Sequence, residues 1–254
     1  MRKIDRTGEV SYNKFGSKII IINYRNYNDI DVYFPEYNWT KTNTDYSRFK
    51  RGAVSCVYEP RTFGIGYLGE GKYKASENGE HTKRYKIWKD MIRRCYGNEK
   101  YYDKYPSYEK CTICEEWHNF QNFAKWFEEN YYGIKKETMC LDKDILYKGN
   151  KIYSPKTCIF VPQRINTLFI KRELYRGDLP LGVDFDDRNC KFRATYRVNK
   201  VKKHLGYYST PEEAFQVYKK VKERDIKQIA NEYKDKIPEK LYNAMITYEV
   251  EIDD

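Results

Sequence analysis

The spacing of hydrophobic residues changes along the chain, and each change predicts a different kind of structure. Isoleucines dominate residues 17–25, and residues 29–37 alternate between apolar and polar positions, as in a half-buried strand. The sequence Asn-Tyr-Asn-Asp between them favours a turn. Residues 1–70 are therefore predicted to be a small β-rich module, ending in a glycine-rich loop at 64–73.

Helical spacing replaces this pattern in residues 71–170. One predicted helix has apolar residues at intervals of three, three, one and three, namely Tyr85, Trp88, Met91, Ile92 and Cys95. Another, within residues 117–132, has Phe120, Phe123, Ala124 and Phe127 on one face. Residues 141–158 then predict a strand, a loop and a short helix that begins at Ser154 and Pro155, because serine caps a helix and proline suits its first position.

A second compact unit is predicted at residues 180–254, after a polar linker at 171–179. Three short alternating segments, 180–185, 191–198 and 204–209, predict an antiparallel sheet. A long amphipathic helix follows, and Thr210, Pro211 and Glu213 form a capping box at its start. The whole chain is thus expected to be an α+β protein of three parts.

Alternation in residues 191–198 separates two faces of the predicted sheet. Phe192, Ala194, Tyr196 and Val198 are expected to face the helix. The opposite, outward face is expected to be basic, through Lys191, Arg193, Thr195 and Arg197, with Lys202, Lys203 and His204 from the next strand. Such a face suits the DNA major groove, where arginine bonds guanine; the plainer alternative is a solvated sheet face.

Charge favours a polyanionic partner. Lys and Arg number 48 against 37 Asp and Glu, a net charge of +11. No apolar run approaches the roughly 18 to 20 residues that span a bilayer, so no membrane partner is expected. The start of the chain lacks the apolar core of a signal peptide, so we expect a cytoplasmic protein with its seven cysteines reduced.

The C-terminal unit resembles the APETALA/ethylene-response-factor type of DNA-binding domain, which also occurs in phage integrases and homing endonucleases. The resemblance covers about residues 180–225 and rests on Gly182-Val183, Phe192-Arg193-Ala194, Leu205-Gly206 and Thr210 to Ala214. It implies a sheet lying in the major groove and braced by a helix. The DNA-facing positions it implies are Arg188, Arg193, Thr195, Arg197, Lys202 and His204. Asp184 and Asp186 depart from the pattern, because the plant proteins have arginine there.

The stretch from Tyr85 to Asn166 resembles a phage and prophage family of HNH-like proteins related to homing endonucleases. The resemblance implies a ββα nuclease finger in which a histidine activates water and an asparagine orients that histidine. By position, Asp142 matches the leading acid, Asn150 the loop asparagine and Asn166 the terminal asparagine. Lys143 stands in the place of the histidine.

That lysine changes the expected chemistry. A lysine is normally protonated at neutral pH and cannot take a proton from water, and Asp142 and Asp144 beside Lys143 favour its charged form. The two aspartates are candidate ligands of Mg²⁺. A zinc site built on Cys111 and Cys114 is not expected, because Cys140 and Cys158, the other candidate ligands, come singly.

The sequence therefore predicts a basic DNA-binding protein of phage or mobile-element origin, acting on double-stranded DNA in the cytoplasm of a bacterial host. Its HNH-like centre lacks the usual general base. One alternative is an active Mg²⁺-dependent homing-type endonuclease or nickase. Another is a phage-encoded inhibitor that binds a host defence protein.

Overall fold

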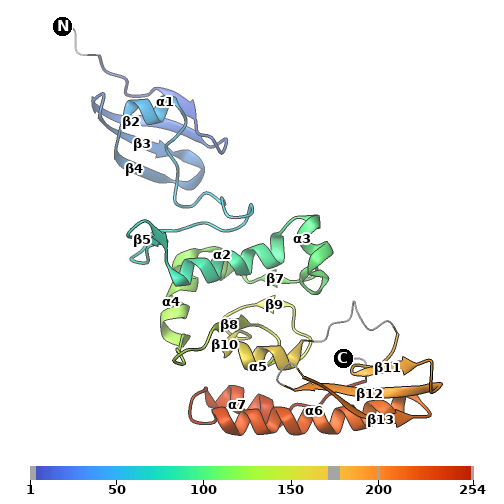
Figure 1. The fold of residues 1–254 in the computed structure, drawn as a ribbon. Helices are drawn as coiled ribbons and strands as arrows, with labels where there is room; N and C mark the ends of the chain where they lie inside the picture. The colour runs from blue at the N-terminus through green and yellow to red at the C-terminus, as the bar shows by residue number, and fades with distance from the viewer. Residues whose placement is uncertain (1–3, 171–177, 199–200, 253–254) are drawn as a thin grey trace. The chain divides into compact units, whose positions relative to one another are not determined.

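A computed structural model describes residues 4–170, 178–198 and 201–252 (Figure 1). The predicted α+β class is confirmed. The chain divides into two compact units, one of residues 1–130 and 151–155, the other of residues 131–150 and 156–254. The predicted linker at 171–179 lies largely outside the described residues. Among the described helices, none is both long and apolar enough to cross a membrane.

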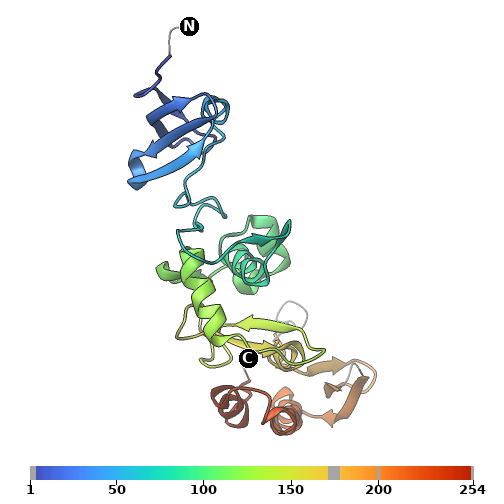
Figure 2. The same ribbon diagram turned by 90° about the vertical axis from the view of Figure 1, so that its left-hand side faces the viewer.

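The first unit begins with a four-stranded antiparallel sheet in the order β1-β2-β3-β4. Its elements are β1 (Val10–Tyr12), β2 (Lys18–Asn26), β3 (Asp29–Phe34), β4 (Trp39–Thr44) and the short helix α1 (Tyr46–Lys50). Alternate residues of β2 and β3, among them Ile19, Ile21, Ile30 and Val32, pack with Phe49 of α1 into one core. The ribbons in Figures 1 and 2 show α1 lying beside this sheet. The β-rich character predicted for this segment is confirmed.

Helices dominate the rest of this unit. They are α2 (Lys83–Tyr96), α3 (Glu99–Lys104) and α4 (Phe120–Asn130), with short strands β5 (Ser76–Glu77), β6 (Glu80–His81), β7 (Thr112–Ile113) and β9 (Ile152–Tyr153). Trp88 and Phe120 join α2 to α4 with ring centroids 5.4 Å apart. The indole nitrogen of Trp88 also donates to the carbonyl of Trp117 at 2.7 Å. The helical spacing predicted for both segments is confirmed, since the predicted faces are buried except at Tyr85, which is half-buried.

The second unit contains an antiparallel strand pair, β8 (Met139–Asp142) and β10 (Ile159–Pro162), followed by the short helix α5 (Gln163–Asn166). We call residues 139–150 and 156–166 the finger. The helix predicted to begin at Ser154 and Pro155 is wrong, because residues 155–157 form a turn that leads into β10. The run from Ile159 to Val161 is apolar and fully buried, and its pairing with β8 outweighs the local helix-start signal.

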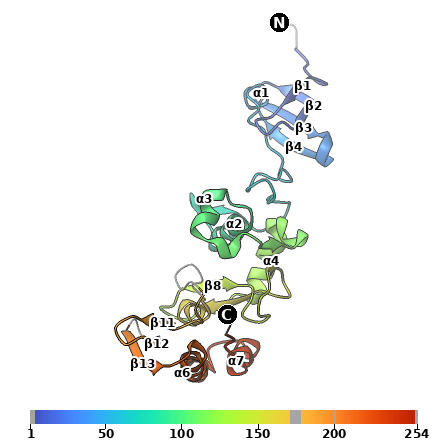
Figure 3. The ribbon, with the colours of Figure 1, turned by 90° about the vertical axis from the view of Figure 1, so that its right-hand side faces the viewer.

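The C-terminal part of this unit is an antiparallel sheet in the order β11-β12-β13 with two helices. Its elements are β11 (Val183–Asp186), β12 (Lys191–Val198), β13 (Val201–Tyr208), α6 (Pro211–Tyr233) and α7 (Glu239–Ile246). The predicted order of three strands and a long helix is confirmed, and so is the capping box of Thr210 and Glu213. Helix α7 packs beside α6 (Figure 3).

Helix α6 takes part in two cores. Its first half packs Ala214, Phe215 and Tyr218 against Val183, Ala194 and Tyr196 of the sheet. Its second half packs Ile226, Ile229 and Ala230 against Ile159, Val161 and Ile165 of the finger. One helix therefore holds the finger and the C-terminal sheet in the same compact unit, whereas the sequence places them in separate parts, at 71–170 and 180–254.

Candidate functional site

The sheet face turned away from α6 is the first candidate site. Residues paired directly across antiparallel strands share a face, and Val183, paired with Ala194, lies on the side of the α6 core. Asp184 therefore faces outward with its partner Arg193, and Asp186 with Lys191. On the other side of β12, Thr195 pairs with His204 and Arg197 with Lys202. The predicted outward positions of β12 are thus brought together on one face.

Two aspartates of β11 engage the central arginine of this face. Asp184 accepts from Nε of Arg193 at 2.7 Å, and Asp186 accepts from Nη1 at 3.0 Å. Lys202 donates to the other oxygen of Asp184 at 3.2 Å. Burial alone would raise the pKa of Asp184, but hydrogen bonds from Arg193 and Lys202 outweigh it and hold that pKa below its usual range. These two bonds hold the guanidinium group of Arg193 in one orientation.

Other basic residues of the face are more exposed. Lys191 and Arg197 are exposed, and neither forms an ion pair with any residue that the structure describes. The rings of His204 and Tyr207 lie in a tilted contact with their centroids 4.6 Å apart. Arg188 is an exposed residue of the turn between β11 and β12. These groups are available to an external anion.

Lys203 does not belong to the outward face, which corrects the sequence prediction. Lys203 pairs with Tyr196, whose ring is buried on the helix side of the sheet. The side chain of Lys203 therefore leaves the strand on the helix side. Successive residues of a strand point to opposite faces, so Lys203 cannot lie on the outward face with its neighbours Lys202 and His204. Tyr207, opposite Arg193, is an outward residue that the sequence reasoning missed.

A register shift between Ala194 and Thr195 explains that omission. The shift leaves Leu205 without a direct partner, and Gly206, opposite Ala194, has a φ of +138°. Sequence alternation counted from the start of β13 therefore fails beyond Leu205. A glycine inside a strand is typical of a bulge, so Gly206 was the available signal.

The finger is the second candidate site. Asp142 ends β8, and its Oδ1 accepts from the backbone N–H groups of Asp144 at 2.9 Å and Ile145 at 2.7 Å. Asn150 donates from Nδ2 to the carbonyl oxygen of Lys143 at 2.7 Å. The structure thus brings Asp142, Lys143 and Asn150 together around one tight turn. Asn166 is half-buried at the end of α5, which packs against β8.

Lys143 is buried, with a relative exposure of 6%. Its ammonium group donates to Oδ2 of Asp144 at 3.1 Å. This ion pair ties the side chain at the general-base position to the turn that follows β8.

Burial and the neighbouring charge of Asp144 raise the pKa of Asp142 to about 6. Both candidate Mg²⁺ ligands already have partners within the finger. Asp142 accepts two backbone hydrogen bonds, and Asp144 is paired with Lys143. Within the described ranges, no group of three or more His, Cys, Asp and Glu side chains lies together as a metal site. We derive no step through a magnesium ion.

The cysteines considered for zinc are placed differently from one another. Cys111 and Cys158 are buried, whereas Cys114 and Cys140 are half-buried. Cys140 contacts Oε1 of Gln163 at 3.0 Å. Burial raises the pKa of the Cys114 thiol, which favours the neutral form rather than the thiolate that zinc binds.

Comparison of the chain with protein-family models, with curated proteins and with solved structures found no match in any of the three.

Proposed function

We propose that this chain binds double-stranded DNA through the outward face of β11–β13, in the cytoplasm of a bacterium that carries a phage or mobile element. The observation that carries the proposal is the row of basic side chains on that face: Lys191, Arg193, Arg197, Lys202 and His204. They lie on the side opposite the α6 core, so the helix braces the sheet without covering them.

The geometry of Arg193 supports reading of a base rather than contact with the backbone alone. Two hydrogen bonds that Arg193 donates to the aspartates hold its guanidinium group, so less side-chain entropy is lost when it meets a base. Arg197 and Lys191 supply uncompensated charge for phosphates. The net charge of +11 adds attraction over a longer range.

In this proposal the finger is a scaffold and not a nuclease centre. Lys143 pairs with Asp144, and Asn150 fixes the main chain at Lys143 in place of orienting a histidine. The finger shares a core with the second half of α6, so it stiffens the helix that supports the sheet.

Fluorescence anisotropy with fragments of the source genome tests the proposal. Arg193→Ala with Arg197→Ala should weaken binding by at least about tenfold and reduce the slope of log affinity against log salt. The matched control is Lys220→Ala with Arg224→Ala, which removes the same charge from exposed positions of α6. Equal losses in both double variants would reduce the claim to general electrostatics.

Incubation of the same protein with supercoiled DNA and Mg²⁺, Mn²⁺ or EDTA separates the alternatives. We expect no nicking. Metal-dependent nicking that Asp142→Ala abolishes would favour the endonuclease alternative. A salt-insensitive, stoichiometric complex with a host protein, together with no DNA binding, would favour the inhibitor.

A further inference from the structure

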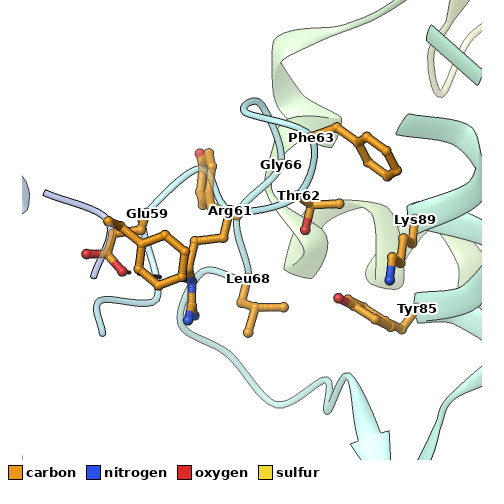
Figure 4. A pocket seen from close by; sticks show the side chains of 10 residues that line it. Glu59, Arg61, Thr62, Phe63, Gly66, Leu68, Tyr85 and Lys89 are labelled. Carbon is orange, nitrogen blue, oxygen red and sulfur yellow. Dashed lines mark ion pairs between the residues drawn. The ribbon is translucent and has the colours of Figure 1, made fainter. Parts of the chain in front are cut away.

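A cavity of about 530 Å³ lies within the first unit, far along the chain from the sheet proposed to bind DNA. The loop at residues 59–68 forms one wall, and Tyr85 and Lys89 of α2 form another (Figure 4). In Figure 4 the Thr62 hydroxyl, the Tyr85 hydroxyl and the Lys89 ammonium group point toward the space between these walls. The volume is in the range of small-molecule sites.

The loop that forms the cavity is held firmly in place. Thr62 and Gly66 exchange two backbone hydrogen bonds of 2.9 Å, which close a small turn. Gly66 lies so close to Trp88 and Ile92 of α2 that a side chain there would overlap both. Farther along, Tyr67 donates to the carbonyl of His118 at 2.9 Å, and Phe120 donates to the carbonyl of Tyr67 at 2.9 Å. The cavity is therefore preformed, which lowers the entropy cost of binding.

The lining carries an excess of positive charge. Glu59 is the only acid among the lining residues, and it is buried in contacts with the side chain of Asn13 and the backbone N–H of Cys56. Nε of Arg61 lies 3.8 Å from the same carboxylate. Lys89 is exposed and forms no ion pair with the residues described. The charge of Lys89 is therefore left for an anion, whereas Arg61 is engaged by Glu59 and by the ring of Phe15.

Aromatic rings stand at the same cavity with unusual exposure. Phe63 is 40% exposed and Phe15 is 58% exposed. Phe63 also adopts a left-handed backbone conformation with a φ of +52°, which is strained for a bulky residue. Backbone strain of this kind clusters at ligand sites. There it holds a side chain in a position that an unstrained backbone would not give it. Arg61 lies over the ring of Phe15 at 5.2 Å, which keeps the guanidinium group beside an aromatic surface.

We propose that this cavity binds a nucleotide, with the phosphate at Lys89 and the base against Phe63. A nucleoside monophosphate combines the two properties that the lining selects, a negative charge and a flat ring. Stacking on an exposed ring is tolerant of base identity, so the site should accept several bases. The same chemistry is offered by a free mononucleotide and by one nucleotide of a single strand.

Isothermal titration of the full-length protein with deoxyadenosine monophosphate and thymidine monophosphate tests the site. We expect saturable binding of both and much weaker binding of deoxyadenosine, which lacks the phosphate. Lys89→Gln should weaken nucleotide binding by about tenfold or more through loss of a charge-assisted hydrogen bond. Lys86→Gln, one turn away on α2 and outside the cavity lining, is the matched control and should change nothing.

Phe63→Ala separates stacking from charge. The substitution should weaken the binding of both nucleotides by about tenfold and leave the binding of inorganic phosphate unchanged. No saturable binding of either nucleotide, or binding that neither Lys89→Gln nor Phe63→Ala weakens, would overturn the proposal.

A short single strand of deoxythymidylate, titrated into the Arg193→Ala, Arg197→Ala double variant, identifies the source of the nucleotide. Binding at least about tenfold tighter than that of the mononucleotide, and still sensitive to Lys89→Gln, assigns the site to a strand. Equal or weaker binding assigns it to the free nucleotide. The inference does not depend on the proposed function, because mononucleotide binding should survive the double variant.

Discussion

Lys143 is the residue at which sequence and environment bear most directly on function. It takes the general-base position of the resemblance, yet its side chain is buried and paired with Asp144. A buried lysine keeps its four-carbon stem in apolar surroundings while its charge finds a partner. The residue is therefore expected to contribute to stability through the stem more than through the charge.

Lys143→Ala should lower the free energy of unfolding by about 2 to 4 kcal/mol, because it leaves a cavity. Lys143→Met keeps the volume and should cost about 1 kcal/mol or less. Asp144 is 43% exposed at its side chain, so water solvates it once the lysine is gone. Urea unfolding, followed by circular dichroism, measures the free energy of unfolding of both Lys143 variants. Equal losses in the two variants would show that the charge matters and the stem does not.

Asp142 should make stability depend on pH. Its pKa is raised from 3.8 to about 6 by burial and by Asp144, so the folded state holds the proton more tightly than the unfolded state does. Stability from this group is therefore present at low pH and is lost as pH rises from about 4 to about 6, by up to about 3 kcal/mol. Asp142→Asn keeps the acceptor oxygen and removes the titration.

The measurement is the difference in unfolding free energy between the wild type and Asp142→Asn at pH 4.5 and pH 7, by urea titration. We expect the stability of Asp142→Asn, relative to that of the wild type, to increase from pH 4.5 to pH 7. A difference that stays constant would mean that Asp142 titrates normally in the folded protein.

At the scale of the element, β11 carries acids where the resembled DNA-binding domains carry arginine. Asp184 and Asp186 lower the net charge of the outward face by two and hold Arg193 still. Fewer free cations weaken contact with any phosphate, while a held arginine favours a correct base over a wrong one. Under the proposed DNA-binding function, this strand favours discrimination between sites at the expense of general affinity.

Asp184→Asn with Asp186→Asn should therefore raise the affinity for arbitrary DNA by about tenfold and steepen its salt dependence. The ratio of the affinity for the specific site to the affinity for arbitrary DNA should fall, because Arg193 is no longer oriented. Competition binding in anisotropy measures the ratio. Asp235→Asn with Glu239→Gln makes the same charge change at exposed positions near α7, and an identical effect there would rule out the role of the aspartates in orienting Arg193.

At the scale of the whole molecule, α6 couples the finger to the C-terminal sheet. Ile226 is fully buried in the core that α6 shares with β10 and α5. The other half of the same helix packs on the sheet. Since a helix is cooperative along its length, loss of one core should loosen the other.

Ile226→Ala should cost about 2 to 5 kcal/mol and reduce hydrogen-exchange protection in β8, β10 and β11–β13 together. Protection in β2–β4 should not change, because those strands belong to the other compact unit. Exchange measured by mass spectrometry reports both regions. Loss confined to β8 and β10 would show that the finger and the sheet unfold separately.

Local signals in the sequence determined much of this protein. The capping box of Thr210 and Glu213, the helical spacing in α2 and α4 and the alternation of β12 depend on neighbours a few residues apart, so they could be predicted directly. The outward positions of Arg193 and Arg197 follow from the same alternation.

Only the tertiary structure decided the rest, because those features depend on partners distant in the chain. The strand at Ile159–Pro162 exists through pairing with β8, against a local helix-start signal at Ser154. The bulge at Leu205 moved Tyr207 onto the outward face, and the aspartates of β11 reached Arg193 across the sheet. The cavity beside Lys89 arises where a loop meets a helix some 20 residues later, a meeting that hydrophobic spacing does not encode.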